Sequence, residues 1–487
     1  MQKQKLFVFI AVCLISAIFA ACGGEADADA KNTDNANDNA EENVEEAKEE
    51  IRENLPEANF DGYEFRVLVE EIHPSYTMDI DITELTGERV NDAIYMRDLS
   101  IEERFGVKIS YKVVTGEGQG TNSAYNSIAA GDNAFDVMKL TPRSASKLYP
   151  ANITANWDEI PWIDLDRPWW NQNIRNQLSI GSRTVWMSSD ASINDYAMIR
   201  GLIFNKDLFE AMALEYPYQL VWDGKWTMAA MEEYMKTMPQ DLNGDGQYTV
   251  DEDRYGIIMA SGVIDELTFT WGSQIISKDE NNMPYLNLYN PRTIDIIAKV
   301  HEWVYDRQYM FAKSNWSDRP AWFESFQSGR TMFMFDVLGQ MILLRDSDVN
   351  FGILPFPKWD ETQEKYKNDA HRAAPQFAIP ATAPNLERTG IIMEALSAEG
   401  HRSVIPEYYE IALKVRDTRD DESEKSIDIL YEGLMYDIAE FYNISFSNLI
   451  TELVLTKQSS DFVSHYEKNE ANAQKALDKF VGEMLKE

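Results

Sequence analysis

The segment DLNGDGQYTVDE (241–252) places oxygen-bearing groups at alternate positions. Five residues of this segment could together bind a metal ion. Four would bind it through side-chain oxygens and the last through its backbone carbonyl: Asp241, Asn243, Asp245, Glu252 and Gln247. Gly246 permits the tight turn between them. Calcium prefers about six to eight oxygen ligands in a flexible arrangement, and the segment matches the EF-hand loop pattern at each position. Because no second loop of this kind is apparent, we expect bound Ca²⁺ to stabilise the fold rather than to signal.

Other motifs with catalytic potential are weak. GEGQG (116–120) follows a predicted strand, but its glycine spacing differs from the dinucleotide fingerprint, so we interpret it as a connection. The 5 histidines are scattered, and neither HExxH nor GxSxG occurs. With 82 acidic residues, a pair of catalytic carboxylates stays open, and a surface glycan-degrading enzyme is therefore an alternative.

Several tryptophans lie in polar, loop-like sequence settings. Trp170 lies in RPWWN, Trp271 in FTWGS and Trp322 in RPAWFESF, and Trp316 has a similar setting. A flat apolar ring beside carboxylates and amides suits a sugar, whose C–H face stacks while its hydroxyls are hydrogen-bonded. Trp170, Trp271 and Trp322 are therefore candidate ligand-binding residues.

The N-terminus has the composition of a lipoprotein signal peptide. Lys3 and Lys5 precede an apolar run, which ends in FAAC at Cys22. The run is short for a membrane-spanning helix, which needs roughly 20 apolar residues. We predict a signal peptide over 1–21 and a lipid anchor on Cys22 at the extracellular face of a bacterial cytoplasmic membrane or in the periplasm. The chain has 2 cysteines, and Cys13 lies within the predicted signal peptide. Cys22 is therefore the one cysteine expected after cleavage, and no disulfide is expected.

Composition separates a tether from a folded body. Residues 22–58 are poor in apolar residues and rich in Asp, Glu, Asn and Ala, which predicts a flexible acidic tether. The net charge of −37 argues against nucleic-acid binding and against docking of the folded body on anionic lipid. From residue 59 onward the chain is long enough for two domains.

The first part of the body has the pattern of a parallel sheet. Three strands are predicted at 63–69, 107–113 and 134–140, and two helices are predicted between them. In the first helix, the apolar residues that share one face are Val90, Ile94, Ile101 and Phe105. Strand–helix–strand–helix–strand is typical of an α/β fold with crossover helices.

Ligands of open α/β sheets bind beyond the carboxyl ends of the strands. These ends point to Glu70 and Glu71 after the first predicted strand and to Arg143 after the third. Asp336, at the end of the strand-like segment 331–336, is a further candidate ligand-binding residue.

Several segments together resemble the extracellular solute-binding lipoproteins of ABC importers, particularly the carbohydrate-binding group. They follow the family's order after Cys22: AGDNAFDVM, GLIFNKDLFE, FESFQSGRTMFMFD, FGILPFPKWD and FAIPATAPNLERTGIIMEALS. The resemblance implies a type II periplasmic-binding-protein-like fold with two α/β lobes and a ligand cleft between them. It implies lobes of 59–193 with 327–380 and of 194–326 with 381–487. The chain would cross between lobes near 188–196, 327–329 and 379–383.

The resemblance also implies a function. A lipid-anchored monomer would capture a carbohydrate, in particular an oligosaccharide, by hinge closure and would deliver it to a permease without covalent chemistry. A binding protein for another solute, such as a peptide, is the second alternative. A neutral ligand fits the charge of −37 better than an anionic one unless Arg143 or Arg372 compensates locally.

Overall fold

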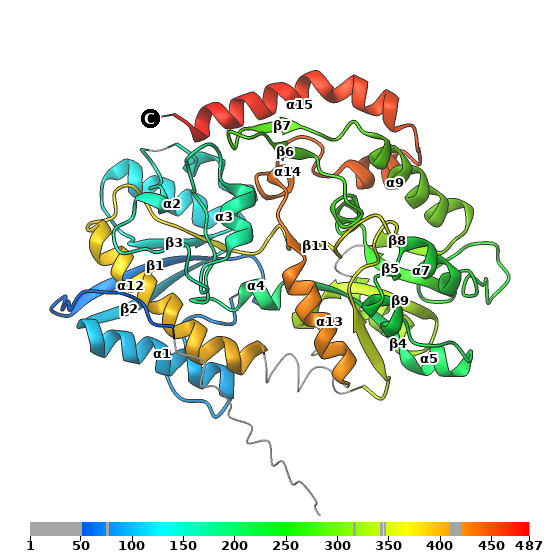
Figure 1. Cartoon of the computed structure of the whole chain (residues 1–487), viewed down its shortest axis with the longest axis horizontal. Coiled ribbons are helices and arrows are strands. Elements are labelled where there is room, and N and C mark those ends of the chain that lie inside the picture. The colour runs from blue at the N-terminus through cyan, green and yellow to red at the C-terminus, as the bar shows by residue number, and fades with distance from the viewer. Residues whose placement is uncertain are drawn as a thin grey trace, which may run out of the picture. The chain divides into compact units, whose positions relative to one another are not determined.

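The computed structural model describes residues 51–74, 77–150, 152–314, 318–340, 344, 347–409 and 420–486. Within this part of the chain, helices surround two separate β-sheets of four and five strands (Figure 1). The predicted α/β class is therefore confirmed. The predicted signal peptide, Cys22, most of the predicted tether and Trp316 lie outside the described residues.

The four-stranded sheet has the strand order β12-β3-β1-β2. Its members are β1 (Tyr63–Glu71), β2 (Val107–Thr115), β3 (Val137–Leu140) and β12 (Gln376–Ala378). β1 pairs in parallel with both β2 and β3, whereas β12 is antiparallel to β3. The three predicted strands and their parallel arrangement are confirmed.

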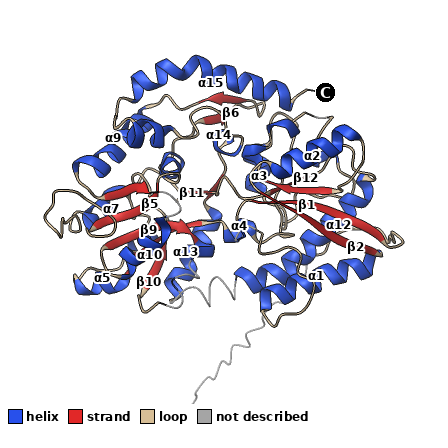
Figure 2. Cartoon of the chain, turned by 180° about the vertical axis from the view of Figure 1, so that it is seen from behind, coloured by secondary structure: helices blue, strands red, loops and turns tan. Residues whose placement is uncertain are grey.

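Helices cover both faces of this sheet (Figure 2). α1 (Arg89–Phe105) connects β1 to β2 and buries Ile94, Ile101 and Phe105, as the apolar spacing predicts. α2 (Gln119–Ala130) connects β2 to β3 and ends at Gly131, whose φ of 68° is favourable for glycine. α12 (Leu386–Glu399) packs against α1.

The five-stranded sheet has the order β10-β4-β9-β5-β8. Its members are β4 (Arg200–Asn205), β5 (Tyr255–Ala260), β8 (Met310–Ser314), β9 (Thr331–Val337) and β10 (Phe351–Leu354). β9 is antiparallel to β4 and parallel to β5. All residues of β4, β5, β9 and β10 are buried, so both faces of this mixed sheet are covered.

The helices around the second sheet are short. They are α5 (Lys206–Ala211), α6 (Tyr218–Trp222), α7 (Met228–Met235), α9 (Pro291–His301), α10 (Arg319–Gln327) and α13 (Asp421–Glu432). Thr227 caps α7, where its hydroxyl accepts a hydrogen bond from the Ala230 amide at 3.3 Å. Met231 and Met235 on the inner face of α7 are completely buried, so its methionines belong to the core.

The remaining elements connect the sheets or lie at their edges. Four are strands in two small sheets: β6 (Ile276–Lys278) with β7 (Pro284–Leu286), and β11 (Asn368–Asp369) with β13 (Leu434–Met435). Five are helices: α3 (Gln172–Leu178), α4 (Asn194–Ala197), α8 (Leu267–Thr270), α14 (Ile438–Phe441) and α15 (Phe462–Met484).

The folded body begins before residue 59. Residues 52–487 form one compact unit. Glu53 lies inside the segment assigned to the tether, yet its carboxylate pairs with Arg104 and accepts a hydrogen bond from Arg402 at 2.8 Å. The end of the predicted tether is therefore anchored on the body.

Sheet membership corrects the expected division into lobes. Residues 327–354 were expected with the first sheet, but β9 and β10 belong to the second, where β9 pairs with β4 and β5. Ser328 and Gly329 form a tight turn from α10 into β9 rather than a crossing, and Gly329 has a φ of 71°. The chain returns to the first sheet only at β12. After residue 381, α12 also stays with the first sheet, on α1.

Candidate functional site

Charged side chains gather at one edge of the second sheet, where β5 and β9 end and β4 begins. Arg200 is the first residue of β4, and Asp336 pairs in register with the next residue along that strand. Arg200 forms an ion pair with Glu266, in the 3₁₀ turn Ile264–Glu266 that follows β5. Asp336 accepts a hydrogen bond from Arg319 at 2.9 Å. This carboxyl edge is where ligands of α/β sheets bind.

A segment that joins the two sheets lies beside this edge. β11 is tied to the start of β4 by a bridge between Ala370 and Ile199. Two residues further on, Arg372 donates to the Glu440 carboxylate on α14 at 2.9 Å. Asp437 caps α14 by accepting the Ala439 amide at 2.7 Å. β11, β13 and α14 therefore add acidic and basic groups to those at the sheet edge.

The first sheet also turns a carboxyl edge toward this segment. Arg143 lies in the turn Pro142–Ser144 after β3, and this turn contacts α14. Its guanidinium forms two hydrogen bonds with Glu117, at 2.7 and 2.8 Å. Arg143 thus lies after a strand end, as the sequence predicts, but the Glu117 carboxylate already binds its guanidinium.

His371 is the residue where the two edges meet. Its side chain is buried, and its Nδ1 accepts a hydrogen bond from the Ala373 amide at 3.0 Å. Burial holds the pKa of His371 well below its usual value, and the nearby charges of Arg200 and Arg143 lower it further. Arg143 follows a strand of the first sheet and Arg200 begins a strand of the second. Charges from both sheets therefore affect the pKa of His371. We refer to the residues around it as the central charged cluster: Arg143, Arg200, Asp265, Glu266, Arg319, Asp336, Asn368, Asp369, His371, Arg372, Asp437 and Glu440.

The carboxylates of the central charged cluster are incompletely satisfied. Both oxygens of Asp369, Oδ2 of Asp336 and Oε1 of Glu440 have no hydrogen-bond partner among the described residues. Burial raises the pKa of Asp265, Asp437 and Glu440 to about 7. Asp369 has a pKa raised well above its usual value by burial. A buried acceptor without a partner costs about 1–3 kcal/mol, so donors from a ligand would be stabilised here.

The two glutamates predicted after β1 have different roles. Glu70 is completely buried, and its Oε2 accepts the Gly120 amide at the start of α2 at 2.9 Å. The carboxylate therefore stabilises the N-terminus of a helix rather than facing an open site. Glu71 is half-buried and accepts the Thr77 hydroxyl at 2.9 Å.

The three predicted tryptophan platforms are packed in the core, and the expectation of open rings is wrong. Trp170 is 2% exposed and donates to Glu394 at 2.9 Å. Trp271, with no exposed surface, packs against Trp303 and Trp359 with ring centroids 5.5 Å apart in each case. Trp322 is 1% exposed. Polar neighbours in the sequence did not place these rings on the surface, because their partners lie far away along the chain.

Sequence reasoning missed most of the central charged cluster. Asp369, Glu440 and Arg200 belong to short elements with no recognisable motif. The one available signal was the pair of strand ends, which located Arg143 and Asp336 but not the residues of the connecting segment.

The predicted calcium loop forms a turn held by its own carboxylates. Oδ1 of Asp241 accepts the Gly244 amide at 2.6 Å, and Oδ2 accepts the Gly246 amide at 2.8 Å. Gly244 and Gly246 have φ values of 74° and 76°, a region that disfavours other residues. Backbone amides of the turn therefore hold both carboxylate oxygens of Asp241, the first predicted ligand position.

The other predicted calcium ligands line the same loop. Asn243 donates to Oε2 of Glu252 at 2.9 Å, which brings the third and twelfth positions together. Asp245 accepts the Gln247 amide at 2.7 Å. In the described part of the chain, no three His, Cys, Asp or Glu side chains are grouped so that they could hold a metal ion. Carboxylates of the loop would therefore have to move inward to bind Ca²⁺.

No helix in the described ranges is long and apolar enough to cross a lipid bilayer.

Comparisons with known proteins identify the fold. No protein-family model and no curated protein matches the sequence. Among solved structures, an ABC substrate-binding protein from Listeria monocytogenes in complex with cycloalternan is similar, with a TM-score of 0.51 and 12% identity. A cyclo/maltodextrin-binding protein complexed with maltotetraose gives a TM-score of 0.53 and 12% identity. In each case the match covers 87% of this chain and 98% of the other. The chain therefore has the two-lobed, periplasmic-binding-protein-like fold of these substrate-binding proteins.

Proposed function

We propose that this chain is the lipid-anchored, extracellular substrate-binding component of an ABC importer. It captures a carbohydrate, in particular an oligosaccharide, and delivers it to a permease without chemical change. The observation that carries the proposal is the fold, which matches substrate-binding proteins solved with cycloalternan and with maltotetraose over 87% of this chain.

The central charged cluster supports a polyhydroxylated solute. Oδ2 of Asp336, both carboxylate oxygens of Asp369 and Oε1 of Glu440 lack donors among the described residues. Sugar hydroxyls are donors that match such oxygens, and a buried hydrogen bond to a charged group contributes about 1.5–3 kcal/mol. We therefore expect these three carboxylates, rather than Glu70 or the predicted tryptophans, to recognise the solute.

Closure of the two lobes would couple binding to transport. Arg143 at the edge of the first sheet and Arg200 at the edge of the second both act on His371 in the connecting segment. A solute that contacts both edges would favour the closed arrangement by its difference in affinity for the closed and open states. The permease would then recognise the closed, loaded form.

Calcium is proposed as a structural ion of the loop 241–252. Its ligands would be the side chains of Asp241, Asn243, Asp245 and Glu252 and the carbonyl of Gln247. The glycine turn and the contact between Asn243 and Glu252 support this assignment.

The lipid anchor is proposed on Cys22, which follows FAA after a basic and apolar leader. In a bacterial host, the wild-type protein should fractionate with membranes and carry an acyl mass on its N-terminus. Cys22→Ala should release the protein into the soluble fraction. An unacylated wild-type N-terminus, or a C22A variant that stays with membranes, would contradict the anchor.

A thermal-shift screen against a glycan panel tests the function. The panel should include maltotetraose, a cyclic glucan, neutral and acidic oligosaccharides from plant and bacterial polysaccharides, and short peptides as comparators. A glycan that raises the melting temperature and is recovered intact by chromatography supports the proposal. Stabilisation by peptides alone would favour another solute, and recovery of shortened glycans would favour a glycan-degrading enzyme.

A further inference from the structure

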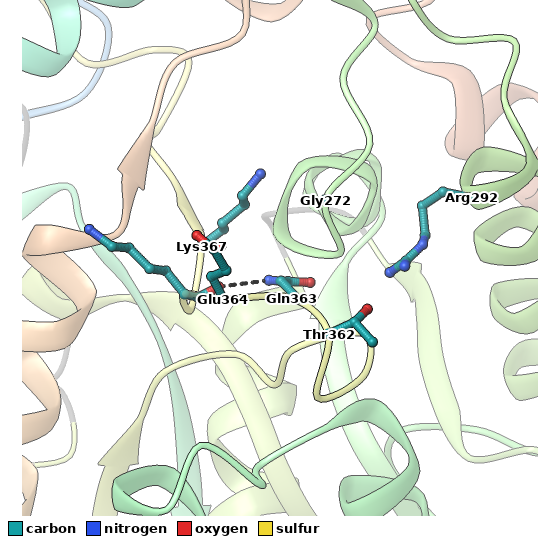
Figure 3. A pocket seen from close by; sticks show the side chains of 7 residues that line it. Gly272, Arg292, Thr362, Gln363, Glu364 and Lys367 are labelled. Atoms are coloured by element: carbon teal, nitrogen blue, oxygen red, sulfur yellow. Dashed lines mark hydrogen bonds between the residues drawn. The ribbon is translucent and has the colours of Figure 1, made fainter.

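A polar hollow lies beside the segment that leads into β11. Its volume is about 460 Å³, which lies within the range of small-molecule sites. The loop 362–367 forms one wall, and Gly272 and Arg292, at the start of α9, form another (Figure 3). Lys367 directly precedes β11, and α8, whose Thr270 carbonyl accepts a hydrogen bond from Gln363 in the wall, contacts β11, so the hollow adjoins the proposed solute site.

Positive charge is concentrated in this hollow. Arg292, Lys365 and Lys367 line it, whereas Glu364 is its one acidic lining residue. In Figure 3, Arg292 and Lys367 approach from opposite sides, with Gln363 between them. The whole chain has more acidic than basic residues, 82 against 45. The lining of the hollow has the opposite balance, because its basic residues outnumber its one acidic residue.

Among the described residues, no carboxylate forms an ion pair with either lysine of the hollow. Neither Lys365 nor Lys367 has a hydrogen bond or an ion pair from its side chain to any described residue. Lys367 is half-buried, and burial together with the charge of Arg292 lowers its pKa. Arg292 makes long contacts, at 3.4 Å to the Asp360 carboxylate and at 3.3 Å to the Trp271 carbonyl, and its guanidinium lies 5.1 Å from the centre of the Trp359 ring. An anion in the hollow would relieve the repulsion between these cations.

The loop that carries the lysines is fixed in place. The Gln363 side chain donates to the carbonyls of Thr270 and Lys365, each at 3.0 Å, and accepts the Trp359 amide at 3.1 Å. A fixed loop presents its cations in one geometry, which reduces the entropy cost of binding. Arg143 and Arg372, which the sequence suggested for an anion, are already paired with Glu117 and Glu440.

We propose that this hollow binds an anionic group of the solute, a carboxylate or a sulfate, so that the saccharide is acidic rather than neutral. The inference rests on the proposed function. It places the anion on Arg292 and Lys367 and the hydroxyls on the carboxylates of the central charged cluster. A local cationic site is what an acidic ligand needs on a protein of net charge −37.

Calorimetric titration of the full chain with matched saccharides tests the inference. The probes are a uronic-acid tetrasaccharide, a sulfated disaccharide and neutral maltotetraose. An acidic probe should bind at least roughly tenfold more tightly than the neutral one, and the stronger of the two acidic probes distinguishes carboxylate from sulfate. When the salt concentration is raised from about 0.05 to about 0.5 M, the affinity for the acidic probe should decrease, and the affinity for maltotetraose should not change.

Variants separate this hollow from general electrostatics. Lys367→Gln and Arg292→Gln should each lower the affinity for the acidic probe about tenfold or more, since each substitution removes a charged hydrogen-bond donor. Lys475→Gln, on the exposed face of α15, makes the same charge change elsewhere and should have no effect. An equal loss of affinity for the acidic probe in K367Q and K475Q would overturn the inference.

The two proposals fail in different ways. If maltotetraose binds as tightly as the acidic probes, the function stands and the anionic hollow is wrong. If no saccharide of either kind binds, the carbohydrate assignment fails and the hollow fails with it.

Discussion

Individual side chains decide what the site can bind, and the informative ones are buried carboxylates. Asp369 lies on β11 and Glu440 on α14, and both oxygens of Asp369 and Oε1 of Glu440 lack partners among the described residues. Such groups destabilise the ligand-free protein when ionised, because burial removes their hydration. Buried carboxyl groups with raised pKa values cluster at functional sites in proteins.

Stability should therefore decrease as pH rises toward neutrality. Burial raises the pKa of Asp265, Asp437 and Glu440 from about 4 in the unfolded chain to about 7. Between these values the folded state keeps protons that the unfolded state has lost, so folding is favoured at the lower pH. Chemical denaturation should give a larger free energy of unfolding near about pH 5 than near about pH 7.5.

Glu440→Gln isolates one contribution to this pH dependence. The amide mimics the protonated carboxyl and keeps an acceptor for Arg372, so the free energy of unfolding should vary less with pH by roughly 1–3 kcal/mol. The same measurement on the variant checks this. A pH profile identical to that of the wild type would show that Glu440 does not carry the raised pKa.

Glu70 should matter for folding more than for binding. Its carboxylate is completely buried at the start of α2, so Glu70→Ala should lower the free energy of unfolding by about 1–3 kcal/mol. Glu71→Ala changes the neighbouring half-buried glutamate and serves as the matched control, with a smaller loss. Urea denaturation measures both. Equal effects would mean that the contact with the Gly120 amide contributes little.

The sequence did not reveal which of the predicted site residues are buried. Trp170 has polar neighbours in the sequence, yet its indole N–H reaches Glu394 on α12, more than two hundred positions away. Contacts over such distances set burial, and local polarity does not report them. Strand ends did locate Arg143 and Asp336, because alternation and helical periodicity are local signals.

Secondary-structure elements were predictable to the extent that their pairing was local. The β1–α1–β2–α2–β3 unit followed from its periodicity because consecutive strands pair in it. β9 was assigned to the wrong sheet because a wholly buried strand carries no pattern that distinguishes one sheet from another. Its partners are β4 and β5, which precede it by many residues.

The loop 241–252 is the element for which we propose a structural calcium ion. Ca²⁺ that binds the folded state alone adds RT ln(1 + [L]/Kd) to the free energy of unfolding, about 2.7 kcal/mol at a hundredfold excess over Kd. Removal of calcium with EGTA should therefore lower the melting temperature in a calorimetric scan. Asp245→Ala should melt at the same temperature with and without EGTA.

Asp251→Ala is the matched control for the calcium loop. Asp251 is an exposed acidic residue of the same segment, at a position that supplies no ligand in the calcium pattern. This variant should keep the full response to EGTA. A wild-type melting curve unchanged by the chelator would exclude a structural calcium ion.

At the scale of the whole molecule, the fold is conserved where the sequence is not. Identity to the two solved substrate-binding proteins is 12%, yet the same architecture extends over 87% of the chain. The resemblance of several segments to the solute-binding family implied the two-lobed architecture, whereas strand and helix patterns alone predicted only the α/β class. The solute was not predictable, because loops and connecting segments with few local constraints contribute the charged cluster and the hollow.

The central claim is that a saccharide binds reversibly between the lobes and closes them. The most direct measurement is small-angle X-ray scattering of the protein alone and at saturation with a saccharide found in the screen. We predict that the radius of gyration decreases on binding, that it returns to its initial value after dialysis, and that the saccharide is recovered intact. A saccharide that is cleaved, or that saturates the protein without any change in the radius of gyration, would contradict the account.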